Sequence, residues 1–280
     1  MGAHALMSAP KVADLSYGEV AVDGGTLPIA MAGDGPPVIL LHGWSLDHRM
    51  WRPQMAGLAG EYFLVMPDRR GCGRSTAPPD LAQEAEDVIA IADSLGFDCF
   101  ALVGLSRGAV VALDVARRFG DRLTALVVSG APLPALVPRE ELIDLERFRM
   151  LAAAGDLATF RAEWAQHPLM ATHNPAAGAL MAEILADYDG RDLATPGVTP
   201  DAPREALAAL AMPVLAMTGE HDTPWRKACA AALSQTAPRA MHALVPDAGH
   251  VANADNPDRF NALVSRFLRA SAAPNTRPHP

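Results

Sequence analysis

The chain has 280 residues, of which 50% are hydrophobic and 20% are charged, with a net charge of −9 and a pI near 5.4. This is the composition of an ordinary globular protein, long enough for one large hydrophobic core or two small ones. The acidic balance and the lack of any local Lys/Arg run exclude nucleic acid as an expected partner.

The cysteines and the chain ends predict a cytoplasmic location. Cys72, Cys99 and Cys229 are odd in number and far apart, so neither a disulfide framework nor a CxxC metal site is indicated. The amino end lacks the features of a signal peptide, and no apolar run reaches membrane-spanning length. We therefore expect no membrane partner and a frayed tail over 271–280, and a homodimer is left open.

From the amino end, the first expected element is an antiparallel hairpin over 18–35 that turns at Asp23-Gly24-Gly25. Apolar runs then recur, and they are typical of strands buried on both faces. Helical patterns separate several of these runs, and those over 80–96 and 109–120 end in Gly. Strand–helix alternation of this kind predicts a parallel sheet. The expected strands cover 37–42, 62–68, 100–106, 123–130, 213–219 and 241–250.

The alternation stops between residues 132 and 211, where helical patterns over 139–167 and 176–189 are joined by Pro-rich segments. We therefore predict a core made of 1–131 and 212–270, with 132–211 inserted as a helical cap. Helices inserted at this point would lie over the carboxyl edge of the sheet, where open α/β sheets bind ligands.

A serine between two glycines marks the end of the third apolar run. Gly104-Leu105-Ser106-Arg107-Gly108 matches G-x-S-x-G, with a predicted strand before it and a predicted helix after it. A turn this sharp needs residues without side chains on either side of the serine. The pattern predicts Ser106 as a nucleophile held on strained backbone.

A serine hydroxyl needs a neighbouring base, which is itself oriented by a carboxylate. His250 follows the last predicted strand and is the expected general base. Asp222 follows the strand over 213–219 and is the expected acid, with Glu220 as its rival. The segment Ser129-Gly130-Ala131, after the strand that precedes the insertion, offers no carboxylate.

The oxyanion of the tetrahedral intermediate needs preorganised donors, usually backbone N–H groups. Trp44 follows a buried strand and the pair His42-Gly43, so its N–H is one expected donor. The N–H of Arg107, at the start of a helix, is the other. The side chain of His42 is predicted to anchor the loop rather than to act as a base.

On these motifs the chain resembles the serine α/β-hydrolases. The matching segments are His42-Gly43-Trp44, "PDRRGCGRS" (67–75), 104–108, "GEHD" (219–222) and "GHVANADNPDRF" (249–260), and the chain order Ser106, Asp222, His250 also agrees. The resemblance implies an α/β-hydrolase fold: a mostly parallel, doubly wound sheet of about eight strands, a helical cap, and neither cofactor nor metal. Within the family the chain is similar to small carboxylesterases and to 3-oxoadipate enol-lactonases.

Arg107 departs from the family pattern, in which His or Met usually flanks the serine. The resemblance implies that this position faces the pocket, which would put a permanent cation beside the reacting carbon. A buried arginine needs a partner. Two hypotheses follow: an internal salt bridge with an acid such as Asp47, or a bond to an anionic group of the substrate.

The resulting functional hypothesis is hydrolysis of a carboxylic ester or lactone of a small molecule through a Ser-His-Asp triad and an acyl-enzyme. Alternatives on the same triad are carbon–carbon bond hydrolysis and cofactor-free haloperoxidase or perhydrolase chemistry, and a non-catalytic binder is the alternative outside enzymes. The expected substrate-binding residues are Trp44, Arg107, Trp164, Tyr188, Trp225 and Val251, with Phe148, Met150 and Met170 as further candidates for the pocket wall.

Overall fold

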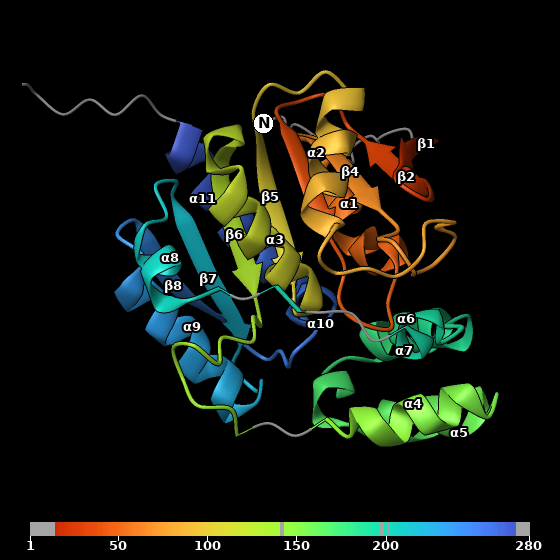
Figure 1. The fold of residues 1–280 in the computed structure, drawn as a ribbon. Helices are drawn as coiled ribbons and strands as arrows, with labels where there is room; N and C mark the ends of the chain where they lie inside the picture. Colours follow the sequence, from red (N-terminus) through yellow and green to blue (C-terminus); the bar gives the residue numbers. More distant parts are fainter. Residues whose placement is uncertain (1–14, 141–142, 196–198, 201, 273–280) are drawn as a thin grey trace, which may run out of the picture.

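The computed structural model describes residues 15–140, 143–195, 199–200 and 202–272 (Figure 1). Expectations for residues 1–14 and 273–280 therefore lie outside the described part. Within it, no helix combines the length and the apolar character needed to cross a bilayer.

Eight strands form one sheet in the order β1-β2-β4-β3-β5-β6-β7-β8. The strands β3 to β8 run parallel, whereas β1 and β2 form the predicted antiparallel hairpin and β2 also pairs antiparallel with β4. The predicted fold class, a mostly parallel sheet of about eight strands, is confirmed. The strands are β1 (Ser16–Val22), β2 (Gly25–Ala32), β3 (Pro37–Leu41), β4 (Phe63–Pro67), β5 (Phe100–Leu105), β6 (Leu123–Ser129), β7 (Val214–Gly219) and β8 (Ala240–Val245).

The central strands are apolar throughout because both of their faces are covered. Every residue of β5 is buried. In β3, Val38 and Leu40 belong to one hydrophobic core, while Ile39 and Leu41 belong to the core on the opposite face. This alternation follows from the period of two of a strand.

Helices cover the two faces of the sheet. The core that contains Ile39 is covered by α2 (Glu84–Ser94), α3 (Arg107–Arg118) and α9 (Pro224–Thr236). The other core is covered by α1 (Arg52–Leu58), α10 (Ala252–Asp255) and α11 (Pro257–Ala272). Short 3-10 helices are η1 (His48–Trp51), η2 (Gly120–Arg122) and η3 (Pro168–Met170).

The segment between β6 and β7 is helical and contains α4 (Leu145–Ala153), α5 (Leu157–Ala165), α6 (Pro175–Ala186), α7 (Arg191–Ala194) and α8 (Arg204–Ala208). The single pattern over 139–167 is divided by Gly155, whose φ is 72°. Asp156 then caps α5 by accepting from the N–H of Thr159. Figure 1 shows α4 to α7 gathered beyond the lower end of the sheet, and these four helices are called the cap below.

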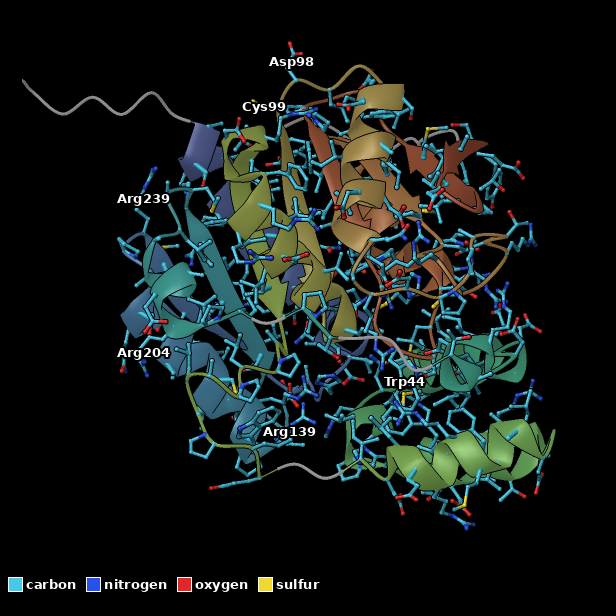
Figure 2. All side chains as sticks on the ribbon, viewed as in Figure 1. Trp44, Asp98, Cys99, Arg139, Arg204 and Arg239 are labelled. Carbon is cyan, nitrogen blue, oxygen red and sulfur yellow. The ribbon has the colours of Figure 1, made fainter. Side chains whose placement is uncertain are left out.

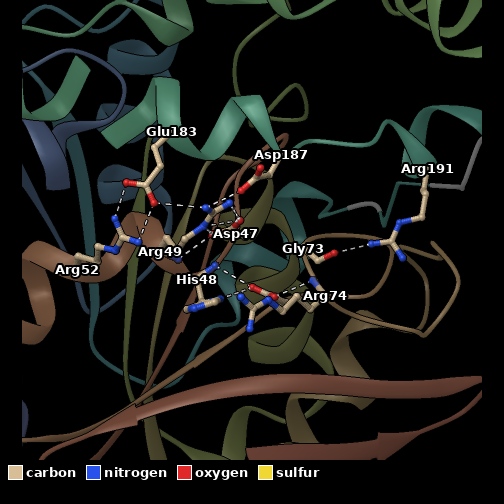
Figure 3. A network of polar contacts seen from close by, with 10 residues as sticks. Asp47, His48, Arg49, Arg52, Gly73, Arg74, Glu183, Asp187 and Arg191 are labelled. Atoms are coloured by element: carbon tan, nitrogen blue, oxygen red, sulfur yellow. Dashed lines mark hydrogen bonds and ion pairs between the residues drawn. The ribbon is translucent and has the colours of Figure 1, made fainter. Parts of the chain in front are cut away.

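Ion pairs join the cap to the core (Figure 3). Arg49 and Arg52 both bind Glu183 of α6, and Arg49 also binds Asp187. Because these carboxylates are about half exposed or more, such pairs contribute little to stability. The stronger connection is apolar, since the core that contains Val38 continues into the cap without a break.

Candidate active site

The turn between β5 and α3 holds Ser106 at φ 55° and ψ −113°, a sparsely populated conformation for a non-glycine residue. A Cβ at Gly104 would lie 2.4 Å from the carbonyl oxygen of Gly108, and one at Gly108 would lie 2.2 Å from that of Leu41. Both glycines are therefore needed for strand and helix to pack this closely. The Ser106 N–H donates to the Ser129 carbonyl at 2.8 Å, which helps to hold the turn.

His250 and Asp222 form a buried pair. The Nδ1 of His250 lies 3.1 Å and 3.0 Å from the two carboxylate oxygens of Asp222, and the exposed fractions of the side chains are 4% and 0%. Nδ1–H therefore donates to the carboxylate, which leaves Nε2 as the acceptor. This Nε2 is buried and has no hydrogen-bond partner among the described residues.

Ser106 and His250 line the same cavity, which has a volume of about 140 Å³. No hydrogen bond joins these two described side chains, and such contacts are often long before a substrate binds. Of the residues expected to bind substrate, Trp44, Arg107, Trp164 and Val251 line this cavity, as does Met170.

The two residues expected to supply the oxyanion donors, Trp44 and Arg107, line the cavity of Ser106. Arg107 is the first residue of α3, so its N–H has no acceptor within the helix. Trp44 lies in the loop after β3, beside the cavity and at the boundary between the core and the cap (Figure 2). That loop is anchored by His42, whose Nδ1–H donates to the Gly43 carbonyl while Nε2 accepts from the N–H of Arg69.

The anchoring of His42 predicts an acid-sensitive fold. Burial, helped by the Arg69 cation, lowers the pKa of His42 to about 3. In the unfolded chain His42 takes up a proton near pH 6.5, whereas in the folded chain it does not. The contribution of His42 to the free energy of unfolding is therefore complete above pH 6.5 and is lost as the pH falls toward 3. The slope from this group is about 1.4 kcal/mol per pH unit. Urea titrations between pH 7 and pH 4 should show that the free energy of unfolding depends less steeply on pH in His42→Asn than in the wild type. An unchanged dependence would contradict the role of His42 as a buried, neutral anchor of the loop.

Two residues that sequence reasoning missed also shape the site. A Cβ at Gly130, which has φ 57°, would lie 2.7 Å from Cε1 of His250, so the imidazole packs directly against this backbone. Asp255 is buried and accepts from the N–H groups of Gly249 and His173, so it ties the His250 loop to the segment that precedes α6.

Arg107 has an internal partner, but it is not Asp47. Its Nη1 lies 3.4 Å from Oδ2 of Asp192 in α7, whereas Asp47 binds Arg49. The guanidinium also lies over the Trp44 ring, 5.4 Å from its centroid. The Arg107 side chain keeps 26% exposure, and it lines the cavity.

Four expected pocket residues lie elsewhere. The Tyr188 hydroxyl donates to Asp192. Trp225 is buried in the core that contains Ile39, and its indole N–H donates to the carbonyl of Val137. Phe148 packs on Trp44 inside the cap, and Met150 is 60% exposed on the outer side of α4. The helical patterns identify these residues as apolar or aromatic, but they do not predict whether each one is buried or what it packs against, and Met150 is exposed.

The rival acid Glu220 is exposed, and its carboxylate accepts from the N–H of Asp247, away from His250. Asp222 does not cap α9 either, because Thr223 occupies the N-cap position.

Another cavity, of about 640 Å³, lies between the core and α6, and Ser106, Asp222 and His250 do not line it. At its wall, Asp47, His48 and Asp68 could together hold a metal ion. Their carboxylates already have partners, however, because Asp47 binds Arg49 (Figure 3) and Asp68 binds His48. A further metal-capable group in the described chain, Glu220, His221 and Asp247, lies on the exposed surface.

Comparison with known proteins agrees with this architecture. The model of the alpha/beta hydrolase family matches residues 38–263. A curated relative from Klebsiella pneumoniae, named "Putative carbamate hydrolase RutD", is 28% identical over 251 residues, which cover 84% of this chain and 92% of that protein.

Two solved structures are similar in fold. A thermophilic esterase from Thermogutta terrifontis is 25% identical with a TM-score of 0.76, and the match covers 92% of this chain and all of that one. An enol-lactonase from Burkholderia xenovorans is 22% identical with a TM-score of 0.75, and the match covers 90% of this chain and all of that one. The family match spans most of the sequence, and the chain belongs to the alpha/beta hydrolase family.

Proposed function

We propose that this protein is a serine hydrolase that cleaves the carboxylic ester or lactone bond of a small molecule. The observation that carries the proposal is the buried imidazole of His250, whose Nδ1 is bound to Asp222 and whose Nε2 is unpartnered at the cavity of the strained Ser106. A neutral imidazole held in this tautomer is the base that a serine nucleophile requires.

The proposed reaction has two halves. His250 Nε2 takes the proton of Ser106 as Oγ attacks the carbonyl carbon, and the oxyanion is stabilised by the N–H groups of Trp44 and Arg107. The intermediate collapses to an acyl-enzyme, and His250 gives its proton to the leaving alkoxide. Water, activated by the same imidazole, then releases the acid. Asp222 holds the imidazole and stabilises its charged form throughout.

The charges around the cavity favour a substrate that carries an anionic group. Among the described lining residues the charged side chains are Arg107, Arg139 and Arg226, and none is Asp or Glu. This contrasts with the net charge of −9 of the whole chain. The volume of about 140 Å³ also favours a small acyl group.

Arg107→Met tests the anionic-group proposal. The backbone N–H survives the change, so hydrolysis of a neutral ester should be largely retained. The value of kcat/KM on a carboxylate-bearing analogue should fall about tenfold further, because a charge-assisted bond contributes roughly 1.5 kcal/mol or more. Arg147→Met, an exposed change on α4, is the control and should affect both esters equally. Equal losses in Arg107→Met would restrict Arg107 to its salt bridge with Asp192.

Covalent labelling tests the proposed function as a whole. A fluorophosphonate probe should add to Ser106, as located by peptide mass spectrometry, and turnover of acetate, butyrate and lactone substrates should vanish with labelling. The curated relatives make carbamate hydrolysis the second candidate, since the same nucleophile attacks a carbamate carbonyl. The same substrate panel therefore includes carbamates, a peracid assay that tests perhydrolase chemistry, and a meta-cleavage product that tests carbon–carbon bond hydrolysis. Labelling elsewhere, or turnover that survives labelling, would contradict the proposal.

A further inference from the structure

The two proposed oxyanion donors are held in different ways. The N–H of Arg107 is fixed by the first turn of α3, whatever its side chain. The N–H of Trp44 belongs to a loop without regular secondary structure, and the next residue, Ser45, has a φ of 59°. The Trp44 peptide is therefore oriented by contacts other than the hydrogen bonds of a helix or a strand.

Core and cap both supply such contacts. From the core, the carbonyl of Gly43, which shares a planar peptide unit with the Trp44 N–H, accepts from His42 Nδ1 at 2.8 Å and from Arg69 Nη2 at 3.3 Å. The cap holds the Trp44 side chain. The Trp44 indole Nε1–H donates to Oδ2 of Asp192 at 2.6 Å, and the Asp192 side chain is only 7% exposed. Arg107 lies 3.4 Å from the same oxygen, and the Tyr188 hydroxyl donates to Oδ1. Burial raises the pKa of Tyr188 far above its usual value, so this hydroxyl remains a donor.

The neighbouring residue is held from the same side. The Trp164 indole, on α5, donates to Oγ of Ser45 at 2.7 Å, and that Oγ donates to the Trp44 carbonyl at 2.6 Å. Cap side chains thus bind the indole of Trp44 and, through Ser45, its carbonyl. The residue that carries the loop donor is therefore held from two sides: the core binds its peptide unit, and the cap binds its side chain and its carbonyl.

We propose that Asp192 is a positioning residue for the oxyanion hole: this carboxylate of the cap orients the Trp44 N–H toward the substrate carbonyl by binding the Trp44 indole. The inference rests on the proposed function. It gives the cap a part in the chemical step, because α7 fixes the side chain of the residue that carries the donor, in addition to the core contacts that hold its peptide unit.

The test compares Asp192→Ala with Asp192→Asn on a neutral ester. Alanine removes the acceptor for the indole, so kcat should fall about tenfold while KM changes little, as expected for an interaction made in the transition state. Asparagine can still accept from Trp44 through its oxygen and can donate its amide to the Tyr188 oxygen. It should therefore keep most of kcat although it loses the charge.

A double-mutant cycle identifies the path of the effect. Trp44→Phe retains the aromatic packing but removes the indole N–H, so it should lower kcat by a similar factor. If Asp192 acts through that N–H, adding Asp192→Ala to Trp44→Phe should lower kcat by less than about twofold further. Independent tenfold losses would overturn the proposal.

Affinity for a tetrahedral analogue separates positioning from simple support of the cap. The inhibition constant of an aryl trifluoromethyl ketone, whose adduct places an oxyanion in the hole, should rise in proportion to the loss of kcat/KM. A lower Tm with unchanged inhibition and kcat would leave Asp192 a structural role only and overturn the proposal. Glu146→Gln, an exposed change on α4, is the control and should alter neither quantity. If Ser106→Ala still hydrolyses the ester, the proposed function fails. If Ser106→Ala loses hydrolysis while Asp192→Ala keeps a normal kcat, only the positioning role of Asp192 is contradicted.

Discussion

Replacing Ser106 with alanine should lower kcat by about 10⁴- to 10⁶-fold with the fold intact, because the substitution removes the attacking oxygen from a site that is otherwise assembled. His250→Ala should cost about as much, since it removes the base. The double variant should be little worse than either single one, because nucleophile and base act as a unit. The measurement is single-turnover and steady-state hydrolysis of one ester by all three proteins.

Asp222→Asn completes the same prediction. An amide in place of the carboxylate can donate to His250 Nδ1 and so favour the wrong tautomer, with an expected loss of about 10⁴-fold in kcat. Glu220→Gln, two residues away and exposed, is the matched control and should leave kcat unchanged. Near-normal hydrolysis by Ser106→Ala or by His250→Ala would refute the triad.

The parts of the site that could be predicted from sequence are those that depend on local chain geometry. The need for Gly104 and Gly108 arises from the turn itself, and the structure shows the backbone contacts that exclude a Cβ at each. The parallel sheet is likewise encoded in uninterrupted apolar runs such as Phe100–Leu105.

Contacts with the cap could not be predicted in this way. Asp192 lies 148 positions from Trp44 and 85 from Arg107, and an aspartate near a helix terminus is common on protein surfaces. The nearer candidate, Asp47, instead forms a pair with Arg49, which is only two positions away in the sequence. Only the docking of α7 on the loop selects the partner of Arg107.

The pocket wall shows the same limit. An aromatic residue on an amphipathic helix is expected to be buried, but the sequence pattern does not show whether it packs against the core or against the cavity. Trp164 reaches the cavity, whereas Trp225 faces the core beneath α9. The two outcomes depend on how each helix is rotated about its axis, which is determined by tertiary packing.

Gly130→Ala should lower kcat by about 10²- to 10³-fold while KM changes little. The new Cβ would lie 2.7 Å and 2.8 Å from Cε1 and Nδ1 of His250 and 3.3 Å from Oδ2 of Asp222. The backbone cannot easily retreat, because the Gly130 N–H donates to the Met217 carbonyl at 2.9 Å and its own carbonyl accepts from Arg226 at 2.7 Å. The imidazole must therefore move, and a displacement of this size misaligns the base.

Gly96→Ala is the matched control that separates this clash from backbone strain. Gly96 has a φ of 73°, comparable to the 57° of Gly130, but a Cβ there meets no atom within 4 Å among the described residues. The left-handed backbone strain should reduce the free energy of unfolding of both variants by about 1 kcal/mol, and the clash with His250 should add to this loss in Gly130→Ala alone. Only Gly130→Ala should lose activity. The covalent adduct of Ser106 with the fluorophosphonate probe should also form more slowly in this variant, because the base is displaced. If the two variants hydrolyse esters equally well, His250 does not act from the position in which Gly130 holds it, and its assignment as the base must be abandoned.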